Sequence, residues 1–113
     1  MTLAEINALD REAFTLRLGA IAEESPWVAY GAYDFRPFAD ALELVAAFRG
    51  AVARADDERQ IALIGAHAAL LPPDALLAGY ERRLAHEPEL GIAIALDEVV
   101  KIIRLRIADL LAV

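Results

Sequence analysis

The sequence predicts an all-α fold, a compact bundle of about six or seven helices in a single domain over residues 1–113. Apolar residues recur every three or four positions along most of the chain, which is the spacing of one face of a helix. No stretch of useful length alternates polar and apolar residues as a strand would. Residues that cap helices, above all aspartate, precede the apolar runs, and prolines separate them.

The first two helices are predicted near the start of the chain. Thr2 and Glu5 have the spacing of a capping box, so a short helix should begin there. Asp10 can cap a second helix that should end near Glu24. Its buried face is predicted from apolar residues three and four positions apart, namely Phe14, Leu18, Ile21 and Ala22.

The third and fourth helices are separated by a proline. Ser25 is a candidate N-cap of the third helix, and Pro26 would occupy its first turn, where proline is tolerated. Arg36-Pro37 should end this helix. The fourth helix is predicted from about residue 38 to residue 55, with an apolar stripe formed by Leu42, Val45, Ala46 and Phe48.

The fifth and sixth helices are predicted to meet at a double proline. Asp56 or Asp57 should start the fifth helix, which runs through Leu71. Pro72-Pro73 cannot continue it, and Asp74 can cap the sixth helix. The buried face of the sixth helix is predicted as Leu76, Leu77, Tyr80 and Leu84.

The final helix is predicted over residues 92–113, after a turn at residues 86–91. Apolar residues occur on nearly every side of it, which is typical of a central core helix or of a helix at a subunit interface. The mean hydropathy of +0.40 is high for an acidic protein and indicates extra apolar surface for a partner or a ligand. We therefore expect a homo-oligomer, most simply a homodimer.

The charge of the chain limits its partners. Its 18 acidic and 11 basic residues give a net charge of −7, which repels phosphate backbones and anionic lipid. We expect neither nucleic acid nor a membrane as partner. The opening residues have no secretory signal pattern and no apolar run is long enough to span a bilayer, so we expect a cytoplasmic protein.

His67 is the first candidate for chemistry. It lies in the apolar run IALIGAHAALL, residues 61–71, so its imidazole should point inward or into the mouth of a pocket. A buried structural histidine and a catalytic acid–base group both fit this position. Metal binding is not expected, because the chain has only two histidines and no cysteine.

Two further sets of residues are candidates for ligand binding. Arg104 and Arg106 should face different sides of the final helix, since two positions turn a helix by about 200°. Each could form a surface ion pair or bind a substrate carboxylate. Trp27 and Tyr30 share a helix face and could be core residues or line a small-molecule cavity.

Six segments of the sequence, in order, resemble the 2-oxo-4-hydroxy-4-carboxy-5-ureidoimidazoline (OHCU) decarboxylases, which complete the breakdown of urate to (S)-allantoin. These segments are MTLAEINALDREAF, SPWVA, RPF, ERQIALIGAH, ERRLAHEPELG and LDEVVKIIRLRIADLL. The resemblance extends over nearly the whole chain. It implies an all-α fold without a cofactor, commonly a homodimer, and a ureide ligand.

The resemblance also implies a site. The family's histidine stands in an Ala-His-Pro-Asp-Leu-Ala motif, and Ala66 and His67 match its first two positions. His67 would thus be the acid–base group. Arg106 aligns with the arginine of the family's terminal Leu-Arg-Leu and would contact a carboxylate of the substrate. The sequence departs from the rest of the histidine motif at Ala68, Ala69 and Leu70.

A larger departure occurs after the histidine. The family's Ser-x-x-Glu-Gln element, whose glutamate works with the histidine, has no counterpart, and Glu87 cannot be substituted for it on this pattern. We therefore expect a shortened, catalytically impaired or inactive scaffold with an apolar groove for a hydrophobic ligand or for self-association. The alternative is an active, cofactor-independent OHCU decarboxylase that uses His67.

Overall fold

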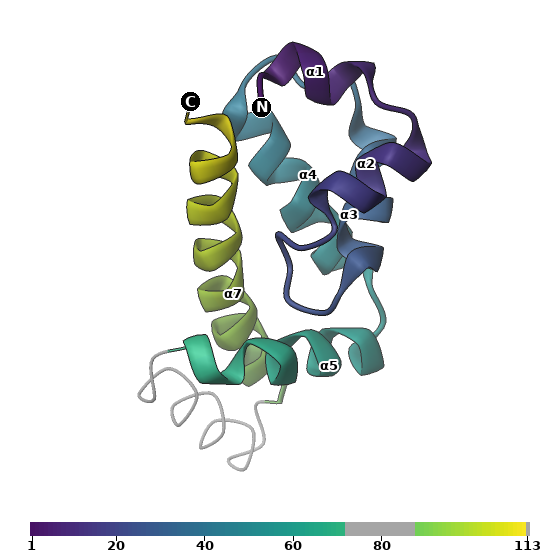
Figure 1. Ribbon diagram of the computed structural model, residues 1–113. Coiled ribbons are helices and arrows are strands. Elements are labelled where there is room, and N and C mark those ends of the chain that lie inside the picture. The colour runs from purple at the N-terminus through teal and green to yellow at the C-terminus, as the bar shows by residue number, and fades with distance from the viewer. Residues whose placement is uncertain (72–87, 113) are drawn as a thin grey trace.

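The computed structural model describes residues 1–71 and 88–112, and this part of the chain is helical without any strand (Figure 1). The elements are α1 (Leu3–Ala8), α2 (Arg11–Leu18), α3 (Pro26–Ala32), η1 (Tyr33–Phe35), α4 (Ala41–Arg54), α5 (Asp57–His67), η2 (Ala68–Leu70) and α7 (Pro88–Leu111), where η denotes a 3-10 turn. The predicted all-α bundle is confirmed.

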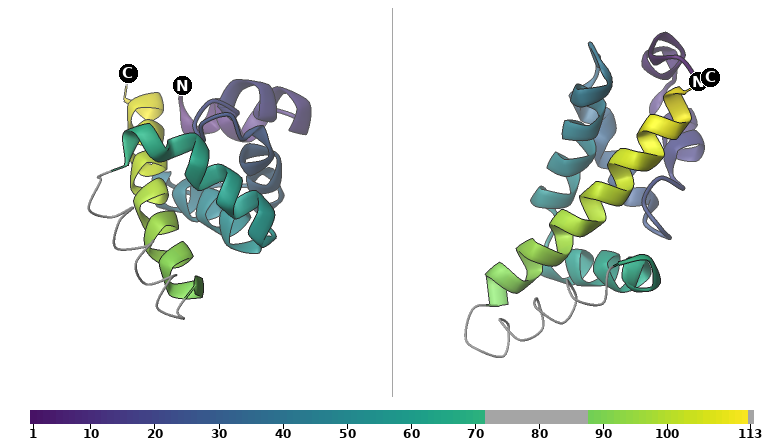
Figure 2. Two further views of the ribbon diagram at one scale, coloured as in Figure 1. Left: turned by 90° about the horizontal axis from the view of Figure 1, so that it is seen from below. Right: turned by 90° about the vertical axis from the view of Figure 1, so that its left-hand side faces the viewer.

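Helix α4 lies at the centre of the arrangement. It contacts α3 on one side and α7 on another, while α2 packs on α3. Helix α5 crosses the lower end of α7 in Figure 1, and both views of Figure 2 show the same crossing. Helix α7 therefore joins the α5 end of the molecule to the end at which the N-terminus lies.

A single core fills the space between these helices. Phe14 of α2 lies 5.5 Å from Tyr33 and 6.0 Å from Phe38, measured between ring centroids. The central helix α4 contributes five buried residues, Leu44, Ala47, Phe48, Ala51 and Val52. From α7 the fully buried Val99, Ile103 and Ile107 follow each other at four-residue spacing, so one stripe of the final helix faces the core.

At the start of four of the described helices, a side-chain oxygen of the residue just before the helix accepts a backbone N–H of the first turn. The side chains of Thr2, Asp10 and Asp56 accept the backbone N–H of the residue three positions on, as their spacing predicts. Asp40 does the same for α4, which begins at Ala41 and hence a little later than predicted. Helix α7 begins at Pro88, earlier than the predicted residue 92.

The second helix is shorter than predicted. It ends at Leu18, and residues 19–25 turn back towards α3. Ile21 and Ala22 are buried as expected, although they lie in this turn. Glu24 has a φ of 48°, in the left-handed region that non-glycine residues seldom occupy. The apolar spacing continued past Leu18, so periodicity alone could not locate the helix end.

Ser25 occupies the N-cap position of α3 and Pro26 its first turn, as predicted. The Ser25 hydroxyl makes no capping bond, however, and instead donates to the carbonyl of Glu23 at 2.8 Å. The predicted apolar stripe of the fourth helix was wrong at two positions. In α4, Leu42 is 67% exposed and Ala46 is also exposed. Because α4 has apolar residues on two sides, composition could not show which side faces α3 and α7.

Some predictions fall on residues 72–87, which lie outside the described part of the chain. They are the double proline, the cap at Asp74, the buried face of the sixth helix, and the assignments of His86 and Glu87. Among the described helices, none combines the length and apolar character needed to cross a membrane.

Candidate functional site

His67 is the last residue of α5 and is fully buried. Its Nε2 accepts the backbone N–H of Glu23 at 3.1 Å. Its Nδ1 lies 2.9 Å from the carbonyl oxygen of Leu63, one turn earlier in α5. Because Nε2 accepts, the proton of a neutral ring is on Nδ1 and is donated to that carbonyl. In this arrangement neither nitrogen is open to a ligand.

Arg106 reaches the same turn from α7. Its Nη1 donates to the carbonyl of Ile21 at 3.0 Å, and its Nη2 lies 2.6 Å from Oε1 of Glu23. The side chains of Arg106 and Glu23 are 29% and 38% exposed. The guanidinium thus closes the turn of residues 19–25 onto α7. Arg104 is exposed on another side of the helix, as the predicted rotation requires.

Glu23 is the residue that brings the histidine and the arginine together. Its backbone N–H bonds to His67, and its carboxylate pairs with Arg106. Within the described residues no carboxylate bonds to either ring nitrogen of His67. No pattern in the sequence pointed to Glu23, because it lies in an irregular turn far along the chain from both partners.

Trp27 and Tyr30 lie elsewhere, on α3. They border a cavity of about 350 Å³ whose other lining residues come from α3, α4 and the start of α5, namely Gly31, Ala51, Arg54, Ala55 and Arg59. Neither His67 nor Arg106 lines it. The four predicted site residues therefore fall into two separate places, and the structure pairs them as His67 with Arg106 and Trp27 with Tyr30.

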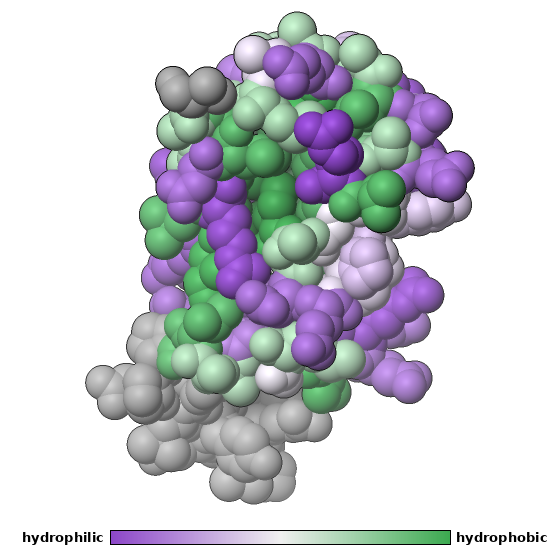
Figure 3. Space-filling model, in the orientation of Figure 1, coloured by the Kyte–Doolittle hydropathy of each residue, from purple (hydrophilic) through white to green (hydrophobic). Residues whose placement is uncertain are grey.

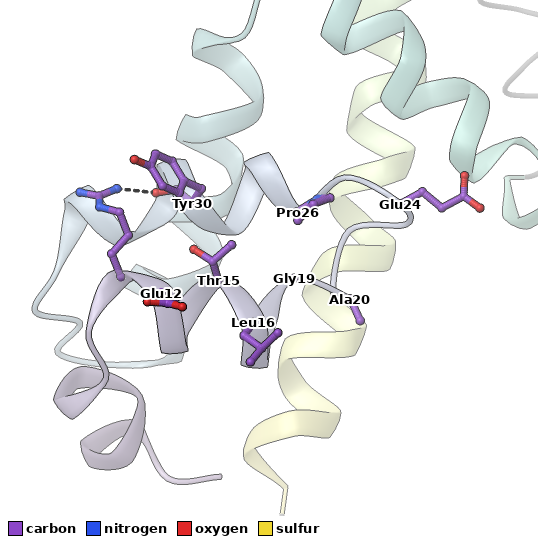
Figure 4. Close-up of a pocket in the computed structure, with 9 residues that line it drawn as sticks. Glu12, Thr15, Leu16, Gly19, Ala20, Glu24, Pro26 and Tyr30 are labelled. Atoms are coloured by element: carbon purple, nitrogen blue, oxygen red, sulfur yellow. Dashed lines mark hydrogen bonds between the residues drawn. The ribbon is translucent and has the colours of Figure 1, made fainter.

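A larger cavity of about 830 Å³ lies between α2 and α3 (Figure 4). It is lined by Arg11, Glu12, Thr15, Leu16, Gly19, Ala20, Glu24, Pro26 and Tyr30, so Tyr30 borders both cavities. The carbonyl of Tyr30 accepts from Arg11 Nη1 at 2.7 Å, the contact drawn in Figure 4. Most of the lining is apolar, and the Thr15 hydroxyl is buried there without a partner among the described residues.

The fold and this site define a small all-helical domain in which an imidazole and an arginine–carboxylate pair meet at one turn. The OHCU decarboxylase family model matches residues 7–75. An OHCU decarboxylase of Haloferax volcanii is 30% identical over 160 aligned positions, which cover 96% of this chain and 95% of that protein. The chain belongs to the OHCU decarboxylase family.

Two other relatives match a shorter part of the chain. The OHCU decarboxylase of Halalkalicoccus jeotgali is 34% identical over 67 residues, which are 59% of this chain and 38% of that protein. The bifunctional uric acid degradation protein PucL of Bacillus subtilis is 36% identical over 66 residues, 58% of this chain and 13% of that protein. No solved structure matches the chain.

The length of the Haloferax volcanii alignment bears on the predicted shortening. It extends over 160 positions, whereas this chain has 113 residues, so some positions of the relative have no counterpart here. That the missing positions come after the His67 motif remains a prediction from the sequence.

Proposed function

We propose that this chain is a shortened OHCU decarboxylase-like scaffold in which His67 has a structural role and decarboxylation is lost or strongly impaired. The observation that supports the proposal is the full burial of His67, whose Nε2 accepts a main-chain N–H and whose Nδ1 donates to a main-chain carbonyl. A general acid or base needs a nitrogen within hydrogen-bond reach of the substrate, directly or through one water.

The chemistry of decarboxylation adds to this argument. The leaving carboxylate must be held, and the electron pair left on carbon must be stabilised and protonated, by several oriented polar groups. Here the guanidinium of Arg106 already pairs with Glu23 and with a main-chain carbonyl. The predicted acid–base group, His67, and the predicted carboxylate contact, Arg106, thus both bind the turn of residues 19–25.

The scaffold proposal leaves a place for a hydrophobic ligand. Among the described cavities, the one between α2 and α3 fits a small apolar molecule best, because its lining is mainly apolar and includes the exposed Leu16. The sequence suggested an apolar groove without giving its position.

Activity on freshly prepared OHCU tests the proposal. The substrate is generated by enzymatic oxidation of urate and hydrolysis of the product, and the optical activity of the allantoin formed is followed by circular dichroism. We expect no more enantiomeric excess than buffer gives, while the Haloferax volcanii relative, named as an OHCU decarboxylase, serves as the positive control. Rapid formation of optically active allantoin by this chain would contradict the proposal.

The alternative function is active OHCU decarboxylation, with His67 as acid–base group and Arg106 as carboxylate anchor. Membership of the family favours this alternative. The contacts of Glu23 favour it too, because they bring the Arg106 guanidinium and the His67 ring to the same residue. In that case a substrate would have to displace the Glu23 N–H from Nε2. His67→Ala should then abolish the enantiomeric excess, and Arg106→Gln should raise KM.

A further inference from the structure

The cavity of about 350 Å³ at the junction of α3, α4 and α5 has the composition of an anion site. We call it the Arg54–Arg59 cavity, after the two guanidinium groups that line it together with Trp27 and Tyr30. Arg54 is the last residue of α4, and Arg59 lies in the first turn of α5. The cavity does not include His67 or Arg106, so a ligand bound in it is independent of the proposed function.

The positive charge of this cavity is not compensated by ion pairs among the described residues. Arg54 Nη2 donates to the carbonyl of Gly31 at 3.3 Å, and its Cζ lies 4.6 Å from the ring centroid of Phe35. Arg59 Cζ lies 5.8 Å from the ring centroid of Trp27. In the part of the chain that the structure describes, neither guanidinium has a carboxylate oxygen within 4.0 Å, as is also true of Arg17, Arg36, Arg49 and Arg104, although the charge of Arg54 acts on Asp34.

The carboxylate of Asp56, just before α5, already accepts a hydrogen bond. Asp56 precedes the helix, and its carboxylate accepts the backbone N–H of Arg59 at 2.8 Å as the N-cap. It therefore holds the main chain at this point, while the Arg59 side chain extends over Trp27. Arg54 and Arg59 are both exposed and line one cavity, so their guanidinium groups are open to a small anion as well as to water.

Aromatic rings supply the remaining walls. Trp27 is half-buried and Tyr30 is 56% exposed, so both can offer part of a ring face to a ligand. Flat rings and guanidinium planes together favour a flat ligand that carries a carboxylate, because the ring stacks while the carboxylate accepts charge-assisted hydrogen bonds. A volume of about 350 Å³ suits a ligand of roughly one ring.

Gly31 keeps the cavity open between α3 and α4. A Cβ at this position would lie 3.1 Å from Cβ of Ala51 and 3.8 Å from Nη2 of Arg54. The missing side chain lets α3 and α4 approach at Ala51. The Arg54 guanidinium donates to the Gly31 carbonyl beside this contact. Arg54 is thereby fixed beside the cavity by a contact that needs no acidic residue.

We propose that the Arg54–Arg59 cavity binds a small planar carboxylate, with the carboxylate on Arg54 and Arg59 and the ring against Trp27. Benzoate is the probe, since it has one ring and one carboxylate. Trp27 is the only tryptophan in the sequence, so its fluorescence, excited at a wavelength that benzoate does not absorb, reports binding at this cavity. Benzamide lacks the charge and acetate lacks the ring, and both serve as ligand controls at constant ionic strength.

We expect benzoate to change the Trp27 fluorescence to saturation. Benzamide should bind at least about tenfold more weakly, the size of one lost charge-assisted hydrogen bond. Acetate should also bind more weakly, because it has no ring to stack on Trp27. Arg59→Gln and Arg54→Gln should each raise the apparent Kd for benzoate by about tenfold. Arg49→Gln is the matched control, because Arg49 is exposed on α4 and does not line the cavity. Circular dichroism verifies that each variant is folded.

Three results would overturn the proposal. They are a fluorescence change that stays linear with benzoate, equal binding of benzoate and benzamide, and equal weakening by Arg49→Gln and Arg59→Gln. If Arg54→Gln does not fold because the Gly31 contact is lost, the comparison of Arg59→Gln with Arg49→Gln decides the question by itself, since the Arg59 side chain makes only its contact with Trp27 among the described residues.

Discussion

The imidazole of His67 contributes to the fold by accepting one particular main-chain donor. The N–H of Glu23 belongs to the turn between α2 and α3, where no regular helix offers it a carbonyl. A buried N–H without an acceptor is costly, so the ring stabilises a turn that also contains the left-handed residue Glu24. An aliphatic side chain of similar size could fill this space but could not accept the hydrogen bond.

Replacing His67 should therefore reduce stability. His67→Ala leaves the Glu23 N–H without its acceptor and opens a cavity in the core, and we expect it to lower the free energy of unfolding by about 3 kcal/mol. Urea unfolding at neutral pH measures the change. Leu70→Ala, at a half-exposed position one turn further on, should cost less than about 1 kcal/mol. Equal stability of His67→Ala and the wild type would argue against a structural role.

A second residue-scale prediction concerns pH. The guanidinium of Arg11 donates a hydrogen bond to Asp34 and lowers the pKa of that carboxyl from its ordinary 3.8, with smaller help from the charges of Arg11 and Arg54 and against the effect of desolvation. A carboxyl with a lowered pKa in the folded state stabilises the protein above pH 3.8, and this contribution is lost as the pH falls through the folded-state pKa.

The stability difference between the wild type and Asp34→Asn should accordingly be present at pH 7 and shrink below pH 3.8. Urea midpoints measured across this range test the prediction. In an Arg11→Gln background the same substitution should give little pH-dependent difference, because the group that lowers the pKa is gone. A difference that stays constant down to the lowest pH would contradict it. The effect is small, since both side chains are at the surface.

At the scale of the helices, the sequence correctly predicted the N-caps that depend only on residues close together in the chain. Thr2, Asp10 and Asp56 cap their helices because the acceptor and the N–H that it binds are three residues apart. Ser25 has the same local pattern, but its hydroxyl donates to the carbonyl of Glu23. That choice results from the path of the turn before α3, which is set by the contacts of Glu23 with His67 and Arg106 and is not encoded locally.

The cap of α5 can be tested in isolation from the core. Asp56→Ala removes the acceptor of the Arg59 N–H and should lower the free energy of unfolding by about 1 kcal/mol. Asp56→Asn keeps a side-chain oxygen at the same place and should cost only a fraction of that amount. Thermal and urea unfolding of the two variants measure the difference. If Asn is as damaging as Ala, the charge of Asp56 matters more than its hydrogen bond.

At the scale of the whole molecule, α7 connects distant parts of the chain. One stripe packs on the core through Val99, Ile103 and Ile107, while Arg106 holds the turn of residues 19–25. The predicted helix was apolar on nearly every side, and the sequence could not say which stripe faces inward. The His67–Glu23–Arg106 cluster was beyond sequence reasoning for the same reason, because its members meet only when three separate elements are packed together.

The outward side of α7 gives the last prediction. Leu105 is 67% exposed, and apolar groups reach the surface along α7 beside a band of hydrophilic side chains (Figure 3). If the homodimer expected from the sequence forms along this side, Leu105→Glu should convert the mass measured by light scattering from that of two chains to that of one. At low protein concentration, the free energy of unfolding of Leu105→Glu should differ from that of the wild type by less than about 0.5 kcal/mol, as for other surface substitutions.

Ile103→Ala provides the contrast on the same helix. It should lower the free energy of unfolding by about 3 kcal/mol at every protein concentration, because Ile103 is fully buried within one chain. If the wild type has the mass of one chain at all concentrations, the dimer prediction is wrong. Leu105 is then an isolated exposed leucine of the kind that many monomers carry. Loss of folding in Leu105→Glu at low concentration would instead mean that this side of α7 is covered within the single chain.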